Sequence, residues 1–83
     1  MTTDRQTLLN TVLTSLHSIA PELEPETLEL ARPLRQQVDL DSMDWLNFLV
    51  SLHERLGVEI AEADYARLVS LNDVLDYLQA RLA

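Results

Sequence analysis

The sequence predicts a small all-α protein, a four-helix bundle of three long helices and one short helix with a long first loop. Apolar residues recur at helical intervals in three segments, and residues that start or stop helices bound these segments. No segment alternates apolar and polar residues strictly enough to indicate a β-strand. Because the chain has 83 residues, we expect a single domain over residues 1–83.

The first predicted helix covers residues 2–20. Thr3 and Gln6 have the spacing of a capping box, and Pro21 ends the segment. The apolar residues of this segment recur at helical intervals: Leu8, Leu9, Val12, Leu13, Leu16 and Ile19.

Residues 21–40 predict a long connection, because they hold all three prolines of the chain and show no long periodicity. Four apolar residues are expected to hold it against the core: Leu28, Leu30, Leu34 and Val38. Loops of this length are uncommon inside compact domains and are often functional.

A second long helix is predicted from Ser42 to Leu56, where Gly57 is a suitable C-cap. Asp41 can cap the start of this helix by itself, which leaves the hydroxyl of Ser42 free for another purpose.

Two further helices are predicted in the last part of the chain. A short helix fits residues 62–68, and Ser70 with Asp73 can cap a last helix. Apolar residues recur along that last helix: Val74, Leu75, Leu78 and Leu82.

The second long helix carries two apolar faces. The broad face, which should contact the core, holds Trp45, Phe48, Leu49, Leu52 and Leu56. A separate strip holds Met43, Leu46 and Val50, with Asn47, Ser51 and Glu54 at its border. Two interpretations of the strip stay open: the helix is buried on two sides, or the strip is an exposed docking site for another protein.

The charge balance limits the partners. Fourteen acidic residues face six arginines, which gives a formal charge of −8. We therefore expect neither nucleic acid nor an anionic membrane as a partner, and we expect basic protein surfaces instead. Residues 39–64 hold seven acids against Arg55 alone: Asp39, Asp41, Asp44, Glu54, Glu59, Glu62 and Asp64.

The sequence does not predict an enzyme or a metal site. Ser42 has no histidine base within reach, because His53 lies about three turns further along the same helix and His17 lies in another helix. The acids near Ser42 do not have the spacing of an EF-hand loop. No secretory signal and no apolar run long enough to span a membrane is present, so we expect a cytoplasmic protein.

The segment "DSMD", Asp41 to Asp44, opens an apolar helix in a small acidic protein. It is followed by "FLVSLHERLGVEI" and "ARLVSLNDVLDYL". Over nearly the whole length, the chain resembles the acyl carrier proteins, whose hallmark is Asp-Ser-Leu at the start of the second helix of a four-helix bundle. It departs from that pattern at Met43, which replaces leucine. Asn47 stands where the family usually has glutamate, and His53 stands at another position that is often acidic. No Gly-Gly precedes Asp41, unlike in the carrier modules of peptide-synthesising assembly lines.

The resemblance implies that Ser42 receives a 4'-phosphopantetheine arm from coenzyme A, added by a Mg²⁺-dependent phosphopantetheinyl transferase. The thiol of the arm then carries an acyl group as a thioester. Further implied partners are an acyl- or aminoacyl-loading ligase and downstream acyl-using enzymes, and we expect a monomer. Partner docking is expected at Asp41, Met43, Asp44, Leu46, Asn47, Val50 and Glu54. The alternative is an unmodified acidic helical domain that binds proteins.

The aromatic residues Trp45 and Phe48 indicate what size of acyl group the protein carries. Related carriers of long acyl chains open a cavity on the face of the helix where this chain places these two residues. We therefore expect a filled interior and a short or polar cargo, such as an aminoacyl group, held outside the bundle. The alternative is that Trp45 covers the edge of the core and swings aside for a chain.

Overall fold

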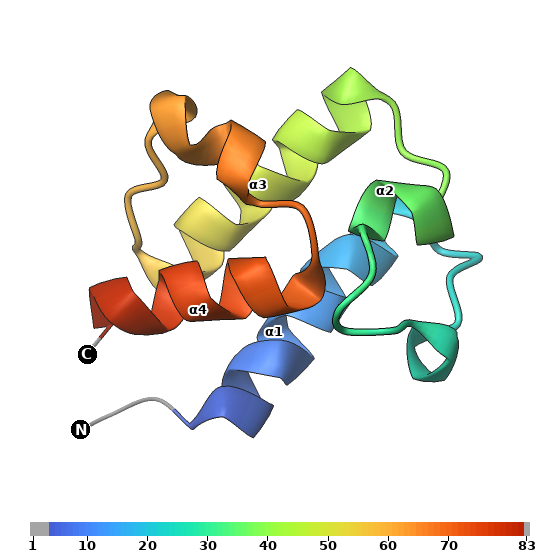
Figure 1. Cartoon of the computed structure of the whole chain (residues 1–83), viewed down its shortest axis with the longest axis horizontal. Coiled ribbons are helices and arrows are strands. Elements are labelled where there is room, and N and C mark those ends of the chain that lie inside the picture. The colour runs from blue at the N-terminus through green and yellow to red at the C-terminus, as the bar shows by residue number, and fades with distance from the viewer. Residues whose placement is uncertain (1–3, 83) are drawn as a thin grey trace.

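The computed structural model describes residues 4–82. Within this range the chain forms helices that are joined by irregular connections. Its elements are α1 (Arg5–Ile19), η1 (Pro25–Thr27), α2 (Leu34–Gln37), α3 (Ser42–Leu56), η2 (Glu62–Arg67) and α4 (Leu71–Leu82). The two η elements are single short stretches of 3₁₀-helix. Helix α1 packs against both α3 and α4, and the first loop with α2 covers one side of this group (Figure 1). The predicted all-α bundle is confirmed.

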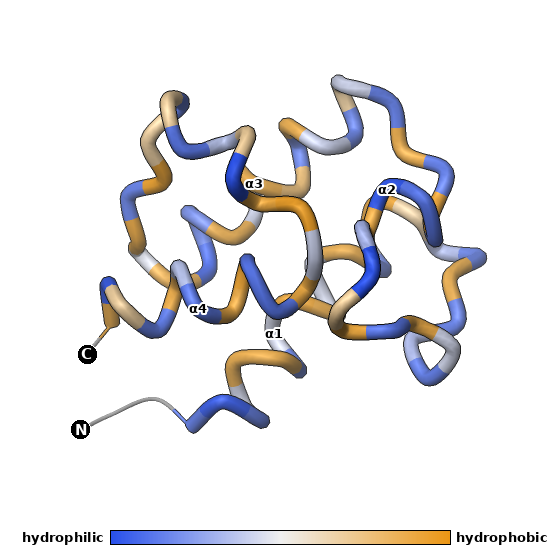
Figure 2. The backbone as a smooth tube through the Cα atoms, in the orientation of Figure 1, coloured by the Kyte–Doolittle hydropathy of each residue, from blue (hydrophilic) through white to orange (hydrophobic). Residues whose placement is uncertain are grey.

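Helix α1 contributes one apolar face to the core. Leu8, Val12 and Leu16 are fully buried together with the polar Ser15, while Asn10 and Thr14 between them are exposed. Figure 2 shows the same alternation of apolar and polar residues along α3 and α4. The expected capping box includes Thr3, which lies outside the described residues. Asp4 occupies the N-cap position of α1, and its side chain makes no capping hydrogen bond.

The first loop is more ordered than the sequence indicates. It contains η1, which begins at Pro25, and α2, which follows Pro33 at its N-cap position. Neither element was predicted, because a single helical turn is too short to show a periodicity. The side chain of Gln37 ties the loop together: its Oε1 accepts a hydrogen bond from Glu29 N at 2.7 Å, and its Nε2 donates to Glu29 O at 2.9 Å.

The loop is held to the core by fewer side chains than predicted. Leu34 and Val38 are buried and Leu28 is half-buried, as expected, but the prediction for Leu30 is wrong because its side chain is 41% exposed. The backbone of Leu30 makes the attachment instead, since its carbonyl accepts a hydrogen bond from Asn72 N at 3.0 Å.

Helix α3 has the predicted bounds and the predicted caps. Asp41 Oδ1 accepts a hydrogen bond from Asp44 N at 2.8 Å. At the other end, Gly57 has a φ of 66°, a left-handed conformation that glycine adopts without strain, and its N–H donates to His53 O at 2.8 Å. Both ends of α3 are therefore capped, the N-terminal end by a side chain and the C-terminal end by a glycine.

The last two elements also follow the prediction. The short helix is the 3₁₀ element η2, and α4 starts with a reciprocal cap in which Ser70 Oγ accepts from Asp73 N while Asp73 Oδ2 accepts from Ser70 N. Val74, Leu75 and Leu78 of α4 are buried against the other helices.

Candidate functional site

The site lies at the N-terminal end of α3, where Ser42 is the first helical residue. Its side chain is exposed, and its hydroxyl makes no hydrogen bond with the described residues. Asp41 provides the cap in its place, by the hydrogen bond to Asp44 N. An exposed hydroxyl at a helix start that is not used for capping is available for chemistry by a partner enzyme.

The chain on both sides of Ser42 is anchored in the core. Before it, Val38 and Leu40 are buried, with 7% and 5% of their surface exposed. After it, Trp45 is 8% exposed and Phe48 is fully buried. These anchors hold the Ser42 hydroxyl on a rigid part of the fold, although it faces solvent.

The apolar strip of α3 is on the surface. Met43, Leu46 and Val50 are 65%, 39% and 42% exposed, so the interpretation that α3 is buried on two sides is wrong. Asn47 and Glu54 beside the strip are exposed as well. The helix therefore presents a continuous apolar surface that begins next to Ser42 and runs for about two turns.

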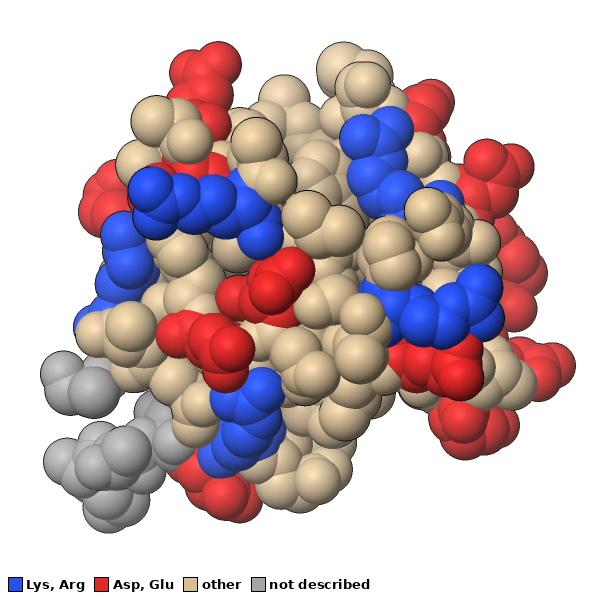
Figure 3. Space-filling view, viewed as in Figure 1, with Lys and Arg blue, Asp and Glu red and all other residues tan. Residues whose placement is uncertain are grey.

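Acidic residues surround this end of α3. Asp39 and Asp41 are exposed, and Asp44 is half-buried in the first turn. In the space-filling view, acidic side chains gather along the edge formed by the first loop and the start of α3 (Figure 3). An apolar strip with an acidic border suits a partner whose surface is basic around an apolar centre.

The broad face of α3 fills the interior below Ser42. The rings of Trp45 and Phe48 lie 5.3 Å apart between centroids and are tilted by 44°, a contact that aromatic pairs favour. Leu49 and Leu52 continue this face and are also buried. The predicted core face is confirmed, except that Leu56 is only half-buried.

A hollow of about 180 Å³ opens beside Trp45, and we call it the Trp45 hollow. Its walls come from three segments and include Pro33, Arg35, Trp45, Tyr65, Leu68 and Val69. Sequence reasoning identified Trp45 but missed Arg35 and Tyr65, because their place in the hollow depends on how α2 and η2 pack against α3. The one signal for Arg35 was its positive charge shortly before an acidic segment.

Neither histidine forms a hydrogen bond with Ser42 in the described part of the chain. His53 belongs to the last turn of α3, and its Nδ1–H donates to Val58 O at 2.7 Å, which ties it to the chain after Gly57. His17 is exposed on α1. Among residues 4–82, no three histidine or acidic side chains gather as metal ligands. No helix in that range has the length and apolar character needed to cross a membrane.

Comparison with known proteins gives a consistent result. A family model described as "Phosphopantetheine attachment site" matches residues 10–78, a range that includes α3 and the Trp45 hollow. The acyl carrier protein of Renibacterium salmoninarum is 28% identical over 75 residues, which cover 87% of this chain and 93% of that protein. The acyl carrier protein of Campylobacter concisus is 28% identical over 57 residues, which cover 69% of this chain and 74% of that protein. The acyl carrier protein of Thermosynechococcus vestitus is 28% identical over 61 residues, which cover 74% of this chain and 75% of that protein.

Proposed function

This chain belongs to the phosphopantetheine-attachment family and is a non-catalytic carrier, and from that premise we propose that Ser42 bears its 4'-phosphopantetheine arm. The arm supplies a thiol that holds an acyl group as a thioester. The chain has no cysteine and therefore no thiol of its own. The proposal depends mainly on one observation: the Ser42 hydroxyl is exposed and makes no capping hydrogen bond, because Asp41 caps the helix.

The other serines are less suitable as attachment points. Ser15 and Ser70 are buried, and Ser70 also caps α4. The hydroxyl of Ser18 donates to Ser15 O at 2.7 Å, and that of Ser51 accepts from Arg55 Nε at 3.2 Å. Ser42 alone among the five combines exposure with an unbonded hydroxyl.

Attachment forms a bond between Ser42 Oγ and the phosphorus next to the pantetheine part of coenzyme A. The pyrophosphate bond breaks, the adenosine bisphosphate part leaves, and the hydroxyl proton passes to a base of the transferase. The new phosphodiester lies at the start of α3, where the helix dipole favours an anion by about 0.3–1 kcal/mol. Asp41 and Asp44 oppose it by charge repulsion, so we assign them to partner recognition.

The partner surface that we propose is the strip of α3 with its acidic border. A phosphopantetheinyl transferase, an acyl- or aminoacyl-loading ligase and acyl-using enzymes would contact this surface: Asp41, Met43, Asp44, Leu46, Asn47, Val50 and Glu54. The strip begins at Met43, directly after Ser42, so a docked partner has the arm close to its own active site.

We also propose that the carrier is a cytoplasmic monomer with a short or polar cargo, such as an aminoacyl group. A net charge of −8 disfavours self-association, and the cytoplasm contains the coenzyme A that the transferase uses. The cargo proposal rests on Trp45 and Phe48, which occupy the interior below the attachment point.

Intact-mass measurement after incubation with coenzyme A and a broad-specificity transferase tests the attachment site. The parent and the control Ser51→Ala should each gain the mass of one phosphopantetheine, and Ser42→Ala should gain none. A Ser42→Ala protein that gains the arm would place attachment elsewhere. A folded parent with unchanged mass would favour the alternative, an unmodified acidic interaction domain.

A further inference from the structure

The Trp45 hollow combines an apolar wall with one positive charge. Trp45, Leu68 and Val69 supply apolar surface, and Arg35 from α2 supplies the charge. Val69 is 45% exposed although it is apolar, so this part of the wall is open to solvent. The hollow therefore suits a ligand that has an anionic group next to a small branched apolar group.

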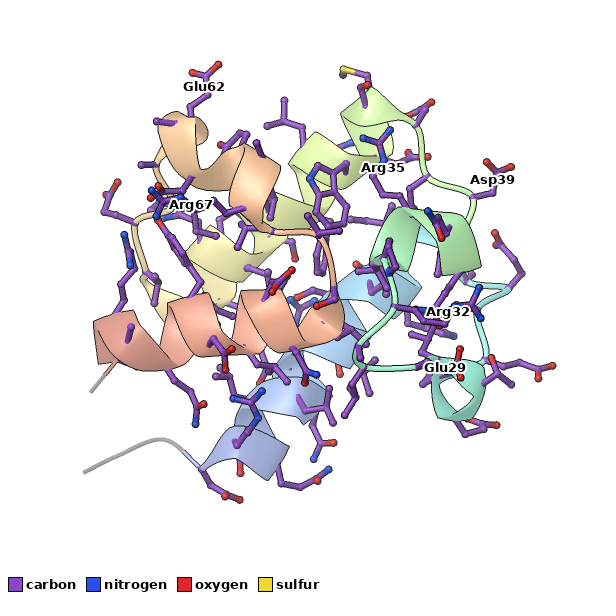
Figure 4. All side chains as sticks on the ribbon, in the orientation of Figure 1. Glu29, Arg32, Arg35, Asp39, Glu62 and Arg67 are labelled. Carbon is purple, nitrogen blue, oxygen red and sulfur yellow. The ribbon has the colours of Figure 1, made fainter. Side chains whose placement is uncertain are left out.

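Arg35 is not neutralised by the acids around it. Its Nη2 donates to Leu40 O at 3.4 Å, and within residues 4–82 it forms no ion pair with a carboxylate. In contrast, Arg32 on the same loop pairs with Glu29 at 2.7 Å. Figure 4 shows Arg35 directed from α2 toward the first turn of α3. Because a guanidinium has five N–H donors, most of those of Arg35 are free for an anion.

The hollow lies within reach of the proposed attachment oxygen. The carbonyl that Arg35 contacts belongs to Leu40, two residues before Ser42, and two residues of extended chain span at most about 7 Å. Trp45 follows Ser42 by three residues in α3, a spacing at which side chains are neighbours on the helix surface. A group attached to Ser42 is therefore near enough to reach both Arg35 and Trp45, although Ser42 itself does not line the hollow.

We propose that the Trp45 hollow binds the part of the phosphopantetheine arm nearest to Ser42. Arg35 contacts the phosphodiester, and the wall at Trp45 receives the dimethyl-substituted carbon that follows it. This inference rests on the proposed attachment at Ser42. Arg35 also offsets part of the repulsion that Asp41 and Asp44 exert on the phosphodiester.

Docking of the arm in this hollow has a consequence for delivery of the cargo. With its first part held against Trp45, the arm leaves the surface between α3 and η2 rather than in all directions. Fewer conformations are then lost when a partner captures the thioester, which lowers the entropic cost of that step. Arg35 is thus a positioning residue for the arm.

Trp45 provides a direct test, since it is the single tryptophan of the chain. The parent is prepared without the arm and, after loading confirmed by intact mass, with the arm. Quenching of the Trp45 fluorescence by acrylamide is then compared between the two forms. We expect the arm to protect Trp45 from acrylamide in the parent.

The variant Arg35→Gln should load normally and lose most of this protection. The loss of one partly exposed ion pair should lower the ratio of docked to free arm about two- to five-fold. The matched control is Arg55→Gln, which has the same change of charge on α3 but lies about 20 Å from Ser42 along the helix axis. Phosphorus NMR of the loaded proteins provides a second measurement, in which Arg35→Gln alone should shift the phosphodiester resonance.

The outcomes separate this inference from the proposed function. If the parent does not gain the arm at Ser42, both are overturned. If the arm is attached but Trp45 is quenched equally with and without it, the inference fails and the proposed function stands. Equal protection and equal phosphorus shifts in Arg35→Gln and Arg55→Gln would overturn the role of Arg35.

Discussion

At the start of α3, two neighbouring polar residues have different tasks. Asp41 satisfies a free N–H of the first turn, whereas Ser42 is left unbonded. Replacement of an N-cap aspartate by alanine removes about 0.5–2 kcal/mol of stability, so we expect that loss for Asp41→Ala. Ser42→Ala should lose less than Asp41→Ala and no more than about 1 kcal/mol. Urea unfolding of both variants measures the difference, and a larger loss for Ser42→Ala would show that its hydroxyl supports the helix.

Asp44 allows the recognition role of the acids to be separated from stability. Asp44→Arg places a cation in the first turn of α3, which costs a few tenths to about 1 kcal/mol through the helix dipole. We expect a larger effect on arm transfer, mainly on the association rate with a basic transferase and on its dependence on salt. Transfer kinetics measured over a salt series check this. Curves that coincide with those of the parent would contradict the assignment of Asp44 to recognition.

The residues of the site differ in how far the sequence predicts them. The roles of Asp41 and Ser42 follow from their order at a helix start, which is a local property of the chain. The exposure of Met43 and Val50 follows from helical spacing once the core face is known, although the sequence left burial on two sides open. Arg35 and its free guanidinium could not be predicted, because they depend on how α2 is placed against α3.

At the scale of elements, α3 has a core face and a partner face that mutations should distinguish. Leu49→Ala or Leu52→Ala removes buried methyl groups and should cost about 2–5 kcal/mol of stability. Met43→Ala or Val50→Ala removes exposed groups and should change the melting temperature little while weakening turnover by partner enzymes. Thermal melting and a transferase assay on the four variants provide the comparison. Similar destabilisation by both pairs would mean that the strip is packed in solution.

Element η2 is attached to α4 by a polar cluster, in addition to Tyr65, which is half-buried and packs against the core. None of its residues is buried, and Asp64 accepts a hydrogen bond from the hydroxyl of Tyr77 at 2.8 Å. The guanidinium of Arg81 lies 3.6 Å from the centre of the Tyr77 ring and contacts Asp64 at 3.4 Å. The cluster of Asp64, Tyr77 and Arg81 therefore fixes one wall of the Trp45 hollow.

Removal of one hydroxyl tests this attachment. Tyr77→Phe keeps the ring and loses the hydrogen bond that its hydroxyl donates to Asp64 and the weaker one that it accepts from Ala61 N at 3.3 Å. At about 0.5–1.5 kcal/mol for each hydrogen bond, the loss should be measurable in urea unfolding. The matched control is Tyr65→Phe within η2, because the Tyr65 hydroxyl makes no hydrogen bond with the described residues. A loss that is the same in both variants would mean that the cluster does not hold η2.

Long and short elements differ in predictability for a physical reason. Helices α3 and α4 could be predicted because their periodicity and caps act over several turns. Elements η1 and α2 depend on contacts with the rest of the fold, such as the 2.8 Å hydrogen bond from Leu34 N to Val69 O. The error at Leu30 has the same origin, since its attachment is made by a backbone carbonyl that a hydropathy pattern does not report.

At the scale of the whole molecule, side chains occupy the centre of the bundle. Three helices contribute the walls, and Phe48, Leu52 and Leu75 occupy the centre with at most 1% of their surface exposed. Insertion of extra methylene groups into a packed core typically costs about 1–3 kcal/mol. A long acyl chain would have to displace Trp45 and Phe48, which are in contact with each other.

The stability of loaded carriers should therefore not increase with the length of the cargo. An acyl chain that enters the bundle contributes about 0.8 kcal/mol of free energy for each methylene group that it buries. The native state would gain stability in proportion to the chain length. A chain that stays outside adds no such term, so we expect melting temperatures that are flat or that fall along a series of acyl groups of increasing length. The melting temperatures of this series are compared with two references, the carrier loaded with an aminoacyl group and the carrier without cargo. Melting temperatures that rise steadily with chain length would show that Trp45 moves aside, and that the carrier shelters its cargo.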